Sequence, residues 1–139
     1  MSLYDLALTI AQEAHKGQVD KAGIDYIHHP IYVASLVETD EEKAVALLHD
    51  VIEDSDITLS DLLNHGIPNN VLKAVSILTK NNKLSYQEYL VQVKSNELAR
   101  KIKLADLKHN SDLSRITDPN KKDYERLEKY KKAIKYLSA

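Results

Sequence analysis

The sequence has no cysteine among its 139 residues and only three glycines and three prolines. Without cysteine the chain has no disulfide framework and no thiolate metal site. No apolar stretch approaches the length of about 18 residues that suggests a membrane-spanning helix, and the N-terminus has no signal-peptide pattern. We therefore expect a cytoplasmic protein that does not contact membranes. Its 43% hydrophobic and 29% charged residues are ordinary for a folded globular domain.

The sequence also has no large excess of positive or negative charge: its formal net charge is −2. This excludes the strongly basic composition of proteins that track nucleic acid. The balance conceals an asymmetry: residues 1–70 hold 3 Lys or Arg and 13 Asp or Glu, whereas residues 71–139 hold 16 and 8. An acidic half suits divalent cations and a basic half suits phosphates. The alternative is two solvated helix faces that neutralise one another, and charge alone favours that alternative.

The scarcity of Gly and Pro, with no run of alternating polarity, predicts an all-helical fold. No internal repeat or linker divides the chain, so we expect a single domain over residues 1–139. Asp40 is the expected N-cap of a central helix that continues to Ser55. The other helices are expected over residues 2–16, from His29-Pro30, over 59–64, from Pro68, and over 85–95, 97–109 and 120–137.

The stretch 44–55 is apolar on nearly every side, yet it carries His49, Asp50, Glu53 and Asp54. Read as a helix, it places His49 and Glu53 four residues apart on one face. Burying a histidine and three carboxylates costs several kcal/mol unless they are paired, hydrogen-bonded or bound to a cation. The alternative is a polar helix end that emerges into solvent.

Two other stretches, residues 26–30 and 103–110, also concentrate side chains that bind metals. In the second, Asp106 and Asn110 share a helix face, and Asp106 follows an apolar pair that predicts an inward orientation. Inward-facing His and Asp groups on different helices are most economically explained by a shared buried cation.

Three motifs, taken together, resemble a known family. They are AHKGQVDKAGIDYIHHPIYVA (14–34), ALLHDVIEDSDIT (46–58) and ARKIKLADLKHNSDLSR (99–115), with LTK at 78–80. They resemble, in order and over most of the chain, the hydrolase domain of RelA/SpoT-type alarmone enzymes in its stand-alone form, the small alarmone hydrolases. The resemblance implies an HD-domain helical bundle with one manganese(II) ion. It also implies removal of the 3′-pyrophosphate from ppGpp or pppGpp to give GDP or GTP.

The resemblance also assigns site residues. The metal ligands are expected to be His29, His49, Asp50 and Asp106. Two imidazoles and two carboxylates, with open positions for water and phosphate, suit an octahedral manganese site. The resemblance implies that Glu53 and Asp54 orient and deprotonate the attacking water.

The same resemblance places Lys21 and Asn110 against the nucleotide. Lys80 and Lys103 are expected either to neutralise phosphate or to lie on the plain surface. Tyr130 is expected either near the nucleoside or in the core. The remaining histidines are assigned no ligand role: His15 and His28 are expected to be structural, His65 to be on the surface, and His109 to form hydrogen bonds at a helix end.

This chain departs from the family at two places. Asp20 precedes Lys21 where the long enzymes have an Arg that helps to hold guanine, which weakens the expectation of base specificity more than that of hydrolysis. Ile24-Asp25 replaces the usual small residue and proline before Tyr26. From the length of 139 residues we expect no synthetase domain and no alarmone synthesis. The alternatives are therefore a phosphohydrolase of another nucleotide, such as NADPH, and a catalytically idle nucleotide-binding module. The sequence leaves the oligomeric state open.

Overall fold

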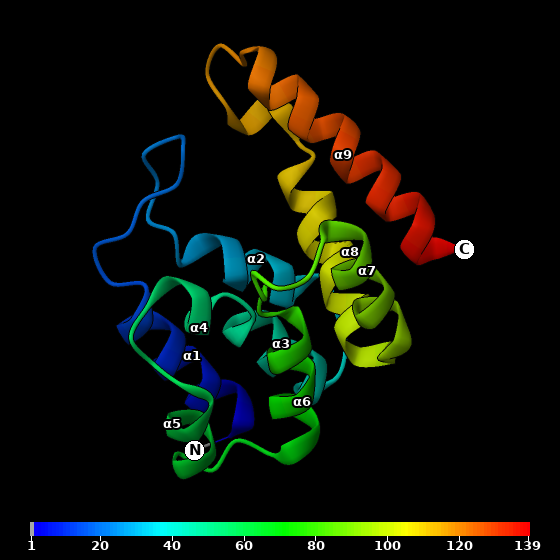
Figure 1. Ribbon diagram of the computed structural model, residues 1–139. Helices are drawn as coiled ribbons and strands as arrows, with labels where there is room; N and C mark the ends of the chain where they lie inside the picture. The colour runs from blue at the N-terminus through cyan, green and yellow to red at the C-terminus, as the bar shows by residue number, and fades with distance from the viewer. Residues whose placement is uncertain (1) are drawn as a thin grey trace.

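The computed structural model describes residues 2–139, which form a bundle of α-helices (Figure 1). Apart from an isolated antiparallel bridge between Val19 and Asp25, this range contains no β-structure. The predicted all-α fold is confirmed. The helices are α1 (Leu3–Ala14), α2 (His28–Ser35), α3 (Asp40–Leu48), α4 (Val51–Asp54), α5 (Leu59–Asn64), α6 (Asn69–Leu78), α7 (Tyr86–Ser95), α8 (Glu97–Asn110) and α9 (Lys121–Ser138), with a 3₁₀ turn at Leu113–Arg115.

Helix α3 is the centre of the bundle. It packs against α1, α2, α6 and α8, and its residues 44–48 have no exposed surface. Each large side chain buried here, such as Leu47 or Leu48, contributes about 1.5–3 kcal/mol through removal of apolar surface from water. Because α3 ends inside the protein, the polar residues that follow it are delivered to the interior.

The central helix is interrupted, so the prediction of one continuous helix to Ser55 is wrong. Helix α3 ends at Leu48, and α4 begins at Val51. Between them, Asp50 adopts φ −106° and ψ −2°, which lies outside the helical range. Nδ1 of His49 lies 2.5 Å from the carbonyl oxygen of Ala46. In a continuous helix this carbonyl would accept from the amide of Asp50, so the imidazole competes with the helix for its acceptor.

The N-terminus of α3 also differs from the expectation. Thr39, rather than Asp40, is the N-cap. Its hydroxyl accepts from the amide of Glu42 at 3.1 Å, and the Glu42 carboxylate accepts from the amide of Thr39 at 2.9 Å, which forms a capping box. Glu42 also pairs with Lys101 of α8 at 2.9 Å. This cap therefore ties α3 to the helix that carries Asp106.

The C-terminal part of the chain forms one wall of the site. Helix α9 packs against α8 and α7 (Figure 1). The loop between α1 and α2 and the connection between α8 and α9 lie at the same end of the molecule. An ion pair between Lys21 and Asp123 joins the first of these to the first turn of α9. Within residues 2–139, no helix combines the length and hydropathy needed to cross a membrane.

Candidate metal centre and adjoining cleft

Three helical segments deliver imidazoles and carboxylates to one buried point. His29 lies in the first turn of α2, His49 and Asp50 lie in the break after α3, and Asp106 lies in α8. One ligand atom from each of His29, His49 and Asp50 lies within 4.8 Å of the other two. Oδ1 of Asp106 is 2.8 Å from Nε2 of His29 and 3.4 Å from Nε2 of His49. The four side chains predicted as metal ligands are thus close together.

The donor set fits a cation. Nδ1 of His49 donates to Ala46, which leaves the lone pair of a neutral ring on Nε2. That atom is buried without a hydrogen-bond partner and faces oxygens of Asp50, at 3.0 Å, and of Asp106. Burial lowers the pKa of His49, but the two carboxylates outweigh burial and raise it well above its usual range. A positive charge, either a proton or a metal ion, is therefore stabilised between these groups.

Tyr26 positions Asp50. Its hydroxyl donates to Oδ2 of Asp50, and burial together with this carboxylate raises the pKa of the phenol. Burial alone would raise the pKa of Asp50, but His49 outweighs it and lowers that pKa to about 2. Asp50 is therefore ionised at neutral pH, as a ligand carboxylate must be.

Asp106 is surrounded by hydrogen-bond donors on its own helix. The amide of Asn110 donates to Oδ1 at 3.1 Å, and the ammonium of Lys103 donates to Oδ2 at 3.3 Å. Burial opposes ionisation of Asp106, but the imidazoles of His29 and His49, followed by the charge of Lys103, hold its pKa well below the usual range. Attraction to the carboxylate likewise outweighs burial and raises the pKa of Lys103.

His49, Asp50 and Asp106 form part of the lining of a cleft of about 270 Å³, whereas His29 lies behind them, outside this lining. Cations line the same cleft: Lys80, Lys103, Arg126 and Lys129. Burial, followed by repulsion from Lys80 and Lys103, lowers the pKa of Lys129. Aromatic rings complete the lining: Tyr26, Tyr86, Tyr89 and Tyr130. Carboxylates and imidazoles that suit a metal thus share one cleft with cations that suit phosphate.

The two predicted acid–base residues lie differently. Glu53 lines the cleft, and the backbone amide of Lys80 donates to its carboxylate. Asp54 lies outside this lining, and its backbone carbonyl accepts from Gln18 at 2.8 Å. Burial and the charge of Asp50 raise the pKa of Asp54. Because the helix is interrupted between His49 and Glu53, these two residues do not share one continuous helix face, contrary to the expectation from the sequence.

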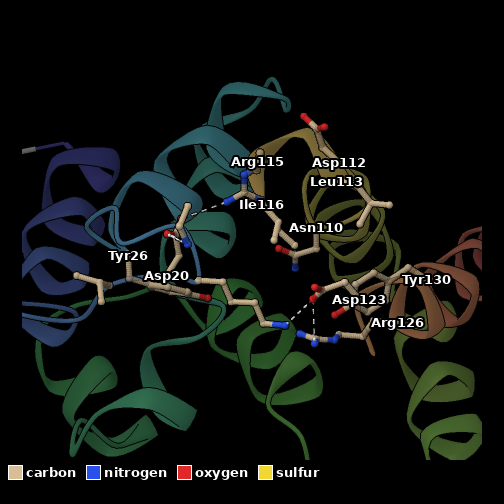
Figure 2. A pocket seen from close by; sticks show the side chains of 13 residues that line it. Asp20, Tyr26, Asn110, Asp112, Leu113, Arg115, Ile116, Asp123, Arg126 and Tyr130 are labelled. Atoms are coloured by element: carbon tan, nitrogen blue, oxygen red, sulfur yellow. Dashed lines mark hydrogen bonds and ion pairs between the residues drawn. The ribbon is translucent and has the colours of Figure 1, made fainter. Parts of the chain in front are cut away.

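A second cavity of about 290 Å³ adjoins the cleft and shares Tyr26, Asn110, Arg126 and Tyr130 with it (Figure 2). Lys21 enters this cavity from the α1–α2 loop and pairs with the buried Asp123 at 3.0 Å. The structure thus brings the predicted nucleotide residues Lys21, Asn110 and Tyr130 to one hollow. Tyr130 also packs against the core, as one of its two alternatives predicted.

Asp20 is used for loop structure. Its Oδ1 accepts from the amides of Ala22 at 2.8 Å and Ile24 at 3.0 Å, and its Oδ2 lies 3.5 Å from the guanidinium of Arg115 (Figure 2). The carboxylate that replaces the family's arginine therefore shapes the loop. It also holds a different arginine, Arg115, against the wall of the cavity.

Several lining residues were not singled out from the sequence. Tyr26 belongs to the motif at residues 14–34, but the sequence predicts no role for it. Arg126 and Lys129 lie three residues apart on the face of α9 that Tyr130 shares, and this spacing was a usable signal. Tyr86 and Tyr89 show the same spacing on α7. Which of these faces turns toward α8 depends on tertiary packing.

The remaining histidines occupy distinct environments. His15 is buried, and its Nδ1 lies 2.9 Å from the side-chain oxygen of Gln18. His28 and His65 are exposed. His109, near the end of α8, lies with its Nδ1 2.8 Å from Nδ1 of His29.

An all-helical bundle with a buried His/Asp cluster between its helices defines a class of metal-dependent domains. The chain belongs to the HD domain family, whose model matches residues 7–133. Curated relatives include guanosine-3′,5′-bis(diphosphate) 3′-pyrophosphohydrolases. The Vibrio cholerae protein is 39% identical over 83 residues, covering 57% of this chain and 12% of the relative. The Haemophilus influenzae protein is 34% identical over 116 residues, covering 73% of this chain and 17% of the relative.

This chain therefore spans less than a fifth of the length of these curated relatives. A solved structure of a metazoan ortholog of SpoT, described as hydrolysing ppGpp, aligns over 99% of this chain and 85% of its own, with a TM-score of 0.79 and 24% identity. That alignment confirms the predicted HD-domain architecture.

Proposed function

We propose that this protein is a manganese-dependent hydrolase that removes the 3′-pyrophosphate of ppGpp or pppGpp and releases GDP or GTP. The observation that carries the proposal is the cleft in which a His/Asp cluster and several cations meet. The curated relatives named above are 3′-pyrophosphohydrolases of guanosine-3′,5′-bis(diphosphate), which supports the substrate class. Residues 1–139 would act as one domain.

His29, His49, Asp50 and Asp106 would hold the metal. A bound divalent ion would polarise a phosphoryl oxygen and lower the pKa of water. Tyr26 would keep one oxygen of Asp50 in place through its hydrogen bond. The hydrogen bonds from Asn110 and Lys103 would likewise keep the carboxylate of Asp106 in place.

Glu53 would accept the proton of the attacking water. Its carboxylate lines the cleft, and the amide of Lys80 restrains it. A bond forms between the water oxygen and the phosphorus next to the ribose, and the bond from that phosphorus to the 3′ oxygen breaks. The 3′ oxygen then takes a proton from solvent. Asp54 would support this step through its negative charge near Asp50 and Glu53.

The cations would bind the pyrophosphate. Lys80 and Lys129 line the cleft without an ion-pair partner among the described residues, so a phosphate oxygen would meet uncompensated charge. Lys103, paired with Asp106, would contribute less. These side chains would neutralise the negative phosphoryl oxygens of the pyrophosphoryl group while it is transferred from the 3′ oxygen to water. The nucleoside would extend into the adjoining cavity toward Lys21, Asn110 and Tyr130 (Figure 2).

The test is a substrate panel. Purified protein is incubated with manganese and with ppGpp, pppGpp, NADPH or GTP, and the products are separated by anion-exchange chromatography. We expect GDP from ppGpp and GTP from pppGpp, each with pyrophosphate, and no turnover by Asp106→Ala. NADPH is included because the carboxylate of Asp20 accepts hydrogen bonds from amides of its own loop. The residue that replaces the arginine of the long enzymes therefore gives no reason to expect selection of guanine. Release of the NADPH phosphate without cleavage of either alarmone would overturn the substrate assignment, and turnover of none would favour a binding module.

A further inference from the structure

His109 contacts His29 from the side away from the His/Asp cluster. The Nδ1 atoms of the two rings are 2.8 Å apart, while Nε2 of His29 is 2.8 Å from Asp106. The two ring planes are inclined by only 7°, and their centroids are 5.0 Å apart. Parallel planes with nitrogens this close describe rings that meet edge to edge, as an in-plane hydrogen bond requires.

This hydrogen bond has consequences for the tautomer of His29. Between two neutral imidazoles, one Nδ1 carries the proton and the other accepts it. If His29 is the donor, its Nε2 keeps a lone pair that points at the cluster. If His109 is the donor, Nε2 of His29 carries the proton and has no lone pair for a metal. Only the first arrangement is compatible with metal binding.

The surroundings of His109 keep it in place as the acceptor. Tyr32 covers its ring at a centroid distance of 4.2 Å, and the guanidinium of Arg115 donates to its backbone carbonyl at 3.0 Å. These contacts hold Nδ1 of His109 within hydrogen-bond distance of Nδ1 of His29.

We propose that His109 is a positioning residue that accepts the Nδ1 proton of His29 and so fixes the tautomer and ring orientation in which His29 binds the metal. This inference rests on the proposed metal site, but it does not depend on the substrate. Partners that hydrogen-bond to the remote nitrogen of a metal-bound histidine commonly change metal affinity by about 10–100-fold. His109, from the same helix as Asp106, fills that position here.

Two substitutions at position 109 separate the effect of losing the hydrogen-bond acceptor from the effect of losing the packing of the ring. His109→Phe keeps an aromatic ring against Tyr32 but has no acceptor. His109→Asn loses the ring but can place its side-chain oxygen near the position of Nδ1. His65→Phe, at an exposed histidine at the end of α5, controls for the loss of an imidazole. Manganese affinity of each metal-free variant is measured from the electron paramagnetic resonance signal of free Mn²⁺, alongside its melting temperature.

We expect His109→Phe to weaken manganese binding by about 10–100-fold, whereas His109→Asn stays within about threefold of the wild type even if it melts earlier. The His65 variant should bind as the wild type does. Equal affinity of His109→Phe and wild type, or weaker binding by Asn than by Phe, would overturn the role of His109 and leave the metal site standing. No binding by the wild type would overturn the metal site as well.

Discussion

Replacing Asp106 with Asn should separate the structural role of this carboxylate from its role as a ligand. The amide keeps the volume of the side chain, so no cavity is created, but it removes the negative charge. In the metal-free protein that charge faces Lys103, whose side chain is only 12% exposed, at 3.3 Å. The substitution leaves a largely buried ammonium without its carboxylate.

Breaking a buried pair by removing one partner costs about 3–5 kcal/mol. We expect a loss at the lower end, about 3 kcal/mol, because Lys103 retains some access to water. For a chain of this size that loss corresponds to roughly 10 °C in Tm. The double variant Asp106→Asn with Lys103→Met removes the unpaired cation as well and should recover at least half of the loss.

The assay is thermal unfolding followed by circular dichroism, first in EDTA and then with manganese. At a manganese concentration of 100 times Kd, the wild type should gain about 2.7 kcal/mol, whereas Asp106→Asn should gain almost nothing. A variant that melts with the wild type in EDTA would refute the energetic role of the Lys103 pair. A variant that manganese stabilises as strongly as the wild type would refute Asp106 as a ligand.

Further tests address the base, the cap and the substrate charge. Glu53→Gln should lower kcat by roughly 10²–10⁴-fold with little change in manganese affinity, and full turnover or loss of metal would reject the assignment. Glu42→Gln should cost about 1–2 kcal/mol in urea unfolding at pH 6, because its carboxylate completes a capping box and pairs with Lys101. The pKa of Glu42 is lowered from 4.5 to about 2 in the folded protein. Its contribution to the free energy of unfolding is therefore present above about pH 4.5 and is lost as the pH falls toward 2. An equal cost of the substitution at pH 6 and pH 2.5 would contradict this. KM for ppGpp should rise between low and high salt, and Lys129→Met should reduce that rise; a salt-independent KM would argue against phosphate binding by this wall.

The sequence by itself determined that the chain is helical. The spacing of its apolar residues and its few Gly and Pro residues locate most helices to within a few residues. This is possible because helical periodicity and capping depend on residues that are close together in the sequence. It also marked Ala44–Leu48 as buried, because a helix that is apolar on every side must lie in a core. The resemblance to the HD-domain hydrolases rested on short motifs that lie along the chain, and the identity to the relatives is modest.

Only the tertiary structure decided how the site is assembled. The break at His49 arises because the imidazole takes the carbonyl of Ala46, a competition that helical periodicity cannot reveal. The contribution of α9 depends on which face packs against α8, and it brings Arg126 and Lys129 to the cleft. The contact between His109 and His29 joins residues 80 positions apart. Such pairings depend on how the helices pack together in space, which no local pattern in the sequence specifies.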